Sequence, residues 1–217
     1  MKNKIGKAMV VGGGISGIRS ALDLAETGYS VILIDRAPNL GGILSQLDYQ
    51  FPNDHCGMCK MLPLVNRDSC SQECLRRGFF HENIEVMLST EVISVDGDAG
   101  NFEVSVRQEP TWIDSDLCMG CGDCVSACPV EIPDTFNTNL DTRKAIFLPV
   151  PHNVSNAYKI DIEACTLCGE CVQACPTDAI SLPTEKLEID EKIINVGAVI
   201  LSGGTSYFDP KTGKNTY

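Results

Sequence analysis

The architecture follows most directly from the segment Ala8-Met9-Val10-Val11-Gly12-Gly13-Gly14-Ile15-Ser16-Gly17. A short apolar run that enters a glycine-rich turn predicts a buried strand. The apolar spacing after the turn predicts a helix over residues 15–27, and Gly28 stands where a helix commonly ends. Residues 29–34 are a second apolar, β-branched run, and Asp35 follows it. The sequence therefore predicts an N-terminal β-α-β unit.

The glycines of this unit have the G-x-G-x-x-G spacing of dinucleotide-binding proteins. Gly12 would allow the turn, Gly14 would let the backbone approach a pyrophosphate, and Gly17 would let the helix pack closely on the strand. The N–H groups at the helix start favour phosphate. Asp35, 23 residues after Gly12, could accept the hydroxyls of a ribose. The alternative is a purely structural glycine-rich turn.

Two cysteine motifs dominate the second half of the chain, and each follows C-x2-C-x2-C-x3-C-P. In bacterial two-cluster ferredoxins with this spacing, the fourth cysteine of each motif binds the other cluster. Zinc sites more often use two separated C-x2-C pairs, so the spacing favours iron–sulfur. We predict two 4Fe–4S clusters, one at Cys118, Cys121, Cys124 and Cys175 and one at Cys165, Cys168, Cys171 and Cys128.

A third cysteine group, within residues 51–75, consists of Cys56, Cys59, Cys70 and Cys74. Zinc, a redox dithiol and a third 4Fe–4S cluster are all compatible with it. We favour the cluster, because, if the N-terminal unit binds a flavin dinucleotide, a redox group near it could exchange single electrons with the flavin, whereas zinc could only brace the loop. The neighbouring His55 is a possible ligand, although such a residue is more often a surface or supporting one.

The composition excludes several classes of partner. Among 217 residues, 17 Lys and Arg face 29 Asp and Glu, giving a net charge of −12, which argues against nucleic acid and anionic membranes. No apolar run approaches the ~18 residues of a membrane helix, and the first one is too short for a signal peptide. We therefore expect a cytoplasmic protein, in which twelve cysteines indicate metal centres rather than disulfides.

The remaining segments suggest that the cysteine motifs interrupt another domain. Residues 83–106 predict a β-meander with a turn at 96–100, and residues 192–201 predict a strand pair. The predicted fold is α/β: an incomplete FAD-type Rossmann domain with an inserted two-4Fe–4S ferredoxin domain. We expect residues 1–110 to begin the FAD-binding domain, 111–185 to form the insertion, and 186–217 to return to the first domain.

The chain as a whole resembles a known family, the N-terminal flavin and iron–sulfur part of the A-type subunits of heterodisulfide reductase and their relatives. Segment 35–42 also resembles the corresponding segment of two-dinucleotide-binding flavoproteins, which points to FAD rather than NAD. The motifs that carry the family resemblance are residues 11–17, Phe51-Pro52 before Cys56, 83–85, 100–102, the two cysteine motifs, 143–146 and 196–200.

The resemblance implies FAD and several 4Fe–4S clusters. It places FAD along Gly12, Gly14, Ile15, Ser16, Gly17, Asp35, Arg36, Gly41, Gly42, Val92 and Gly203. The chain departs from the family where Ser202-Gly203-Gly204 replaces the usual Ala-Thr-Gly. It also stops at Tyr217, whereas the family continues with a second nucleotide-binding domain. We therefore expect either a fragment of a longer subunit or one half of a split protein whose flavin site another chain completes.

The resemblance further implies an electron-transfer subunit of a soluble oxidoreductase complex, with hydrogenase-, heterodisulfide reductase- or benzoyl-CoA reductase-type partners and possible bifurcation at the flavin. No acid–base or nucleophilic constellation surrounds the three histidines, so we expect substrate chemistry on partner chains. A cluster-only wiring module without flavin is the alternative. An enzyme that oxidises NAD(P)H itself would need a second G-x-G-x-x-G.

Overall fold

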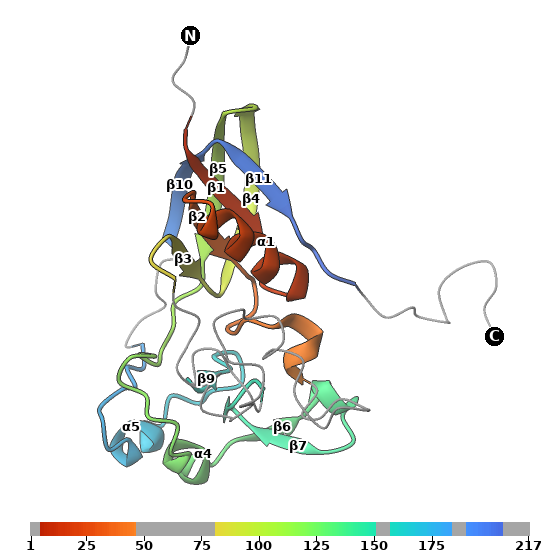
Figure 1. Ribbon diagram of the computed structural model, residues 1–217. Coiled ribbons are helices and arrows are strands. Elements are labelled where there is room, and N and C mark those ends of the chain that lie inside the picture. The colour runs from red at the N-terminus through yellow and green to blue at the C-terminus, as the bar shows by residue number, and fades with distance from the viewer. Residues whose placement is uncertain (1–4, 47–80, 151–156, 184–189, 206–217) are drawn as a thin grey trace, which may run out of the picture.

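The computed structural model describes residues 5–46, 81–150, 157–183 and 190–205. In Figure 1, two β-sheets with helix α1 lie above a smaller part that carries the short helices α4 and α5. Within the described residues, none of the helices combines the length and apolar character that crossing a membrane requires. The third cysteine group and His55 lie outside the described residues.

A four-stranded parallel sheet contains the predicted β-α-β unit. Its strands are β1 (Lys7–Val11), β2 (Ser30–Ile34), β3 (Ile84–Met87) and β11 (Ala198–Leu201), in the order β11-β1-β2-β3. Helix α1 (Ile15–Glu26) covers one face and buries an apolar stripe against it. The N–H of Gly28, which has φ +90°, donates to the carbonyl of Ala25, so the helix ends as expected. The predicted α/β class is confirmed.

A three-stranded antiparallel sheet covers the other face. Strands β4 (Thr90–Asp98), β5 (Asn101–Gln108) and β10 (Asp190–Val196) are ordered β10-β5-β4. Val104, Val106 and Val196 pack on Met9 and Ile32 of the parallel sheet, all almost fully buried. The upper part therefore has three layers, with α1 in front of the parallel sheet in Figure 1.

Two of the strand predictions were wrong in their pairing. Residues 83–106 are not one meander, because β3 pairs in parallel with β2 while β4 and β5 form a separate hairpin. The hairpin strands run through the predicted turn, which is limited to Ala99 and Gly100. Strands β10 and β11 likewise pair with β5 and β1, not with each other. Gly197 separates them, and a Cβ there would overlap the carbonyl oxygen of Ile5.

The cysteine motifs lie in a unit that leaves the antiparallel sheet and returns to it. Asp190 at the start of β10 pairs with Gln108 at the end of β5, so the chain departs and comes back at one point. The unit contains η2 (Thr135–Asn137), and its other elements are α4 (Asp123–Ala127), α5 (Glu170–Ala174), β6 (Glu131–Pro133), β7 (Thr142–Lys144), β8 (Ile146–Phe147) and β9 (Lys159–Ile160). The domain boundaries given above stay predictions.

Candidate cofactor sites

The glycine-rich turn is built so that only glycine fits at two positions. Gly12 has φ +106°, and a Cβ there would overlap the carbonyl oxygen of Ser202. A Cβ at Gly17 would overlap the carbonyl oxygen of Gly12. At Gly14, which precedes α1, a Cβ would meet nothing within 4 Å, and the helix has no side-chain cap. The turn thus leaves open space at a helix N-terminus, which is the cradle that a pyrophosphate requires.

Asp35 connects the end of β2 to this turn. Its Oδ2 accepts a hydrogen bond from the N–H of Gly13 at 2.5 Å, and its Oδ1 accepts one from the N–H of Ala37 at 2.7 Å. Each carboxylate oxygen keeps a further lone pair, so the predicted acceptance of ribose hydroxyls is compatible with this arrangement. Sequence reasoning had not anticipated the role of Asp35 in holding the turn against the following loop.

The loop after β2 folds back over the turn. The N–H of Gly41 donates to the carbonyl of Gly13 at 2.7 Å. A Cβ at Gly42, which begins the 3-10 helix η1 (Gly42–Gln46), would lie 3.1 Å from the Cα of Gly14. The structure therefore brings both segments together at the carboxyl edge of the parallel sheet.

Five other predicted FAD residues have less direct positions. Gly203 follows β11 at the same sheet edge, and its neighbour Ser202 lies against Gly12. Ile15 and Ser16 begin α1 and are exposed, and Arg36 follows Asp35. Val92 lies in β4 of the other sheet; two residues earlier, the N–H of Thr90 donates to the Asp35 carbonyl at 2.8 Å. The structure thus brings β4 to the same edge, although no contact of Val92 with the turn is seen among the described residues.

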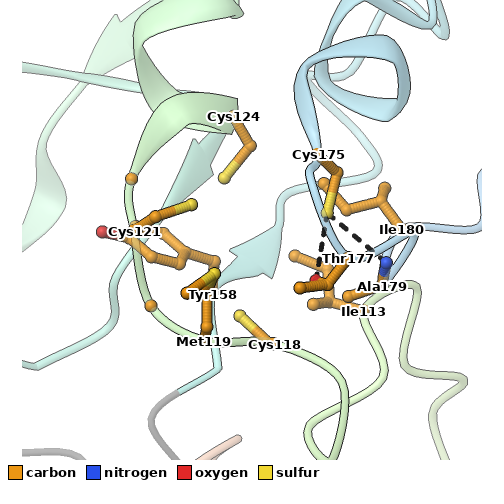
Figure 2. A pocket seen from close by; sticks show the side chains of 12 residues that line it. Ile113, Cys118, Met119, Cys121, Cys124, Tyr158, Cys175, Thr177, Ala179 and Ile180 are labelled. Atoms are coloured by element: carbon orange, nitrogen blue, oxygen red, sulfur yellow. Dashed lines mark hydrogen bonds between the residues drawn. The ribbon is translucent and has the colours of Figure 1, made fainter.

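The first cysteine pocket draws on both motifs. Cys118, Cys121 and Cys124 of the first motif line it together with Cys175 of the second. Figure 2 shows these sulfurs facing a common space that Tyr158 borders on one side. Ile113, Ala179 and Ile180 provide an apolar wall. This combination is the set of four predicted from the ferredoxin spacing.

The second pocket is built in the same way. Cys165, Cys168 and Cys171 line it with Cys128 of the first motif. Its apolar wall contains Val130, Ala145, Ile146 and Ile160. Eight cysteines from two distant motifs therefore form two interleaved sets of four. The three residues that each set takes from one motif lie around the start of a short helix, α4 or α5.

Burial and the neighbouring cysteines raise the pKa of one cysteine in each pocket. Burial raises the pKa of Cys124 to about 11, and the neighbouring Cys118 and Cys121 contribute to that rise. Burial also raises the pKa of Cys171, with Cys165 adding to the effect. Thiols with raised pKa values stay protonated at neutral pH, whereas coordination to iron deprotonates them. Buried cysteines gathered in fours are thus suited to binding a metal cluster.

Cys175 differs from these buried cysteines. Burial raises its pKa, but hydrogen bonds from Thr177 and Ala179 outweigh that effect and lower it overall. Tyr158 has a raised pKa because of burial and the nearby cysteines, so its hydroxyl stays neutral. Neither Thr177 nor Tyr158 was singled out from the sequence. The sequence does contain a signal for Thr177, because the two motifs differ at this place: Thr177 follows the Cys-Pro pair of the second motif, and Val130 follows that of the first.

The choice between a cluster and a single ion follows from the spacing of the cysteines. Both motifs have the C-x2-C-x2-C-x3-C-P pattern of two-cluster ferredoxins, whereas zinc sites more often use two separated C-x2-C pairs. The interleaved sets of four in the two pockets agree with the ferredoxin pattern.

Comparison with known families agrees with both kinds of site. Residues 8–54 match the family model described as FAD dependent oxidoreductase. Residues 117–179 and 157–211 match two models described as 4Fe-4S dicluster domain. The predictions of FAD and of 4Fe–4S clusters are thereby confirmed, apart from the third cluster. Fold and sites together define a protein of the flavin and iron–sulfur class.

Curated relatives give the particular resemblance. The chain is 44% identical over 94% of its length to an A-type iron–sulfur subunit of CoB–CoM heterodisulfide reductase from Methanopyrus kandleri. It is 43% identical over 96% of its length to the A-type subunit of an H2/formate:CoB-CoM heterodisulfide,ferredoxin reductase from Methanococcus maripaludis. A protein from Archaeoglobus profundus that is described as similar to the same type of subunit is 42% identical over 71% of the chain. The resemblance to the A-type subunits of heterodisulfide reductase is thus confirmed.

The chain corresponds to part of these relatives. It spans 29%, 30% and 21% of the three proteins. Among solved structures, L-proline dehydrogenase from P. horikoshii aligns with a TM-score of 0.36 and 23% identity, covering 47% of this chain and 19% of that one. The sequence relatives and the family models, not this alignment, carry the assignment.

Proposed function

We propose that this chain is an electron-transfer module that holds FAD at the glycine-rich turn and two 4Fe–4S clusters in the cysteine pockets. The observation that carries the proposal is the interleaving of the eight cysteines, since each pocket takes its fourth sulfur from the other motif. Helices α4 and α5 are packed against each other, so the two sites lie side by side in one structural unit. FAD can exchange electrons in pairs or singly, whereas 4Fe–4S clusters exchange them singly.

The proposed partners are other subunits of a redox complex. Similarity to heterodisulfide reductase subunits supports this general role. Hydrogenase-, heterodisulfide reductase- and benzoyl-CoA reductase-type complexes, and bifurcation at the flavin, are the specific forms we propose. The chain spans about 29% of its first relative, and we propose that a segment equivalent to the remainder, in the same subunit or on another chain, completes the flavin site. The proposed location is the cytoplasm.

A desalting experiment distinguishes the flavin-containing module from a cluster-only one. We expect anaerobically purified protein to keep a flavin absorbance band and a broad iron–sulfur band after gel filtration. Extraction and chromatography should identify the flavin as FAD. Clusters without flavin, in the presence of the natural partners, would instead establish the cluster-only alternative. Material without iron and inorganic sulfide would reject both.

The third cysteine group gives a separate prediction. If Cys56, Cys59, Cys70 and Cys74 hold a 4Fe–4S cluster, iron and sulfide analysis should give about twelve irons per chain. Alanine at Cys56 should then remove about four of them and leave the two dicluster signals unchanged. About eight irons together with one bound zinc would show that this group is a zinc site.

A further inference from the structure

The two cluster sites are related by an internal repeat with an offset of 47 residues. The N–H of Cys118 donates to the carbonyl of Asp114 at 3.0 Å, and the N–H of Cys165 donates to Asp161 at 2.9 Å. Cys128 and Cys175, which end the two motifs, donate to the carbonyls three residues earlier at 3.3 and 3.2 Å. Up to the fourth cysteine, the backbones of the two halves therefore match closely.

The repeat breaks just after the fourth cysteine. In the second half the chain continues directly to Ala179 and Ile180, and Ile180 forms a β-bridge with Ile113. In the first half, the β6–β7 hairpin (residues 131–144) is inserted at this point. After the hairpin, Ile146 pairs with Ile160, which is the residue equivalent to Ile113 in the repeat. Ala145 thus occupies the place in its half that Ala179 occupies in the other.

This break changes the hydrogen bonds to the fourth cysteine. The Cys175 sulfur accepts a hydrogen bond from the N–H of Ala179 at 3.4 Å and contacts the hydroxyl of Thr177 at 3.7 Å, as Figure 2 shows. In the other half, the N–H of Ala145 donates to the carbonyl of Val130 at 3.2 Å instead of to a sulfur.

Cys128 therefore has a poorer environment for negative charge. Val130 takes the place of Thr177 and has no hydroxyl. The one hydrogen bond of the Cys128 sulfur among the described residues runs to the carbonyl of Val130 at 3.8 Å, and the sulfur is its donor. An iron-bound thiolate has no proton to donate there. Cys175 consequently gains two donors as a ligand, and Cys128 gains none from the described part of the chain.

Hydrogen bonds to ligand sulfurs stabilise the extra negative charge of a reduced cluster and raise its reduction potential. The second pocket has one such donor of its own, because the N–H of Leu167 donates to the Cys165 sulfur at 3.4 Å. Nearby charges also bear on the comparison. Asp178 beside Cys175 opposes the effect. Arg143 and Lys144 of the hairpin, which would favour reduction of the other cluster, are paired with Asp161 and Glu131 at 2.9 Å each.

We propose that the two clusters are unequal, and that the one at Cys118, Cys121, Cys124 and Cys175 has the higher reduction potential because Thr177 and Ala179 donate to Cys175. An electron shared between the clusters then rests at that site. This inference depends on the proposed function, since it assumes a 4Fe–4S cluster in each pocket. Thr177 acts indirectly, through its hydrogen bond to the Cys175 sulfur, and is therefore a positioning residue. The β6–β7 hairpin is the structural cause of the difference between the two sites.

The test is a redox titration of the purified protein, followed by EPR, on four forms: wild type, Thr177→Val, Thr177→Ser and Val130→Thr. Thr177→Val copies the residue of the other half and should shift one reduction step to a more negative potential. Thr177→Ser keeps the hydroxyl and should leave that step close to its wild-type position. Val130→Thr should shift a different step to a more positive potential.

In the wild type, the reduction step that Thr177→Val shifts should have a more positive potential than the step that Val130→Thr shifts. Steps that neither substitution moves belong to other centres. The inference is overturned if Thr177→Val leaves every step in place, if Val130→Thr raises none, or if the order is reversed. Iron, sulfide and EPR signals in the wild type separate this failure from the absence of clusters, which would reject the proposed function itself.

Discussion

Replacing Cys175 with alanine is expected to remove the cluster of the first cysteine motif while leaving the cluster of the second motif intact. Cys175 lies in the second motif in sequence but shares a pocket with Cys118, Cys121 and Cys124. Losing one of four thiolate ligands should cost most of one cluster, or about four irons per chain. Iron and sulfide analysis with EPR of the dithionite-reduced protein would measure the loss.

Double variants make the interleaving testable. Cys121→Ala and Cys175→Ala act on the same predicted cluster, so combining them should remove no more iron than either alone. Cys121→Ala combined with Cys128→Ala should remove both clusters, about eight irons per chain. If each motif held its own cluster, these two outcomes would be exchanged. Ser126→Ala, between two cysteines of the first motif but absent from both pocket walls, is a matched control that should keep all the iron.

The cysteine spacing was sufficient to predict which side chains meet, because the geometry of a cubane restricts its ligands to a few sequence patterns. The same is true of the β-α-β unit, in which each of Gly12, Gly17 and Gly28 occupies a position that restricts side chains. Such local constraints can be read from a single sequence.

Strand partners could not be predicted in this way. The segment that contains β3, β4 and β5 is rich in strand-forming residues throughout. Val86 pairs with Leu33 of the parallel sheet, whereas Val92 pairs with Val106 of the antiparallel sheet. Nothing in the segment itself indicates this difference. That choice depends on long-range burial, because Met87 of one sheet and Val104 of the other share a single core between the two sheets. The β6–β7 hairpin was likewise recognisable only as extra length between the motifs, and its effect on the Ala145 N–H depends on three-dimensional register.

The second large effect is expected at the glycine-rich turn. Gly14→Ala should lower the affinity for FAD at least about tenfold, which corresponds to ~1.4 kcal/mol. The open space beside Gly14 is the place where the backbone would approach the pyrophosphate, and a methyl group would occupy it. Flavin fluorescence titration of the deflavinated protein, together with the flavin-to-protein ratio after desalting, would measure the change.

The fold itself should tolerate Gly14→Ala, because Gly14 has φ −77° and an added Cβ meets no atom within 4 Å. We expect a stability change of at most about 1 kcal/mol, the usual cost of alanine at a helix N-cap. Gly17→Ala is the contrasting variant: its Cβ would overlap the Gly12 carbonyl oxygen, so it should lose about 2–3 kcal/mol of stability as well as flavin. Thermal unfolding separates the two causes. If Gly14→Ala bound FAD as tightly as the wild type, the pyrophosphate could not lie against this turn, and the glycine spacing would serve helix packing alone.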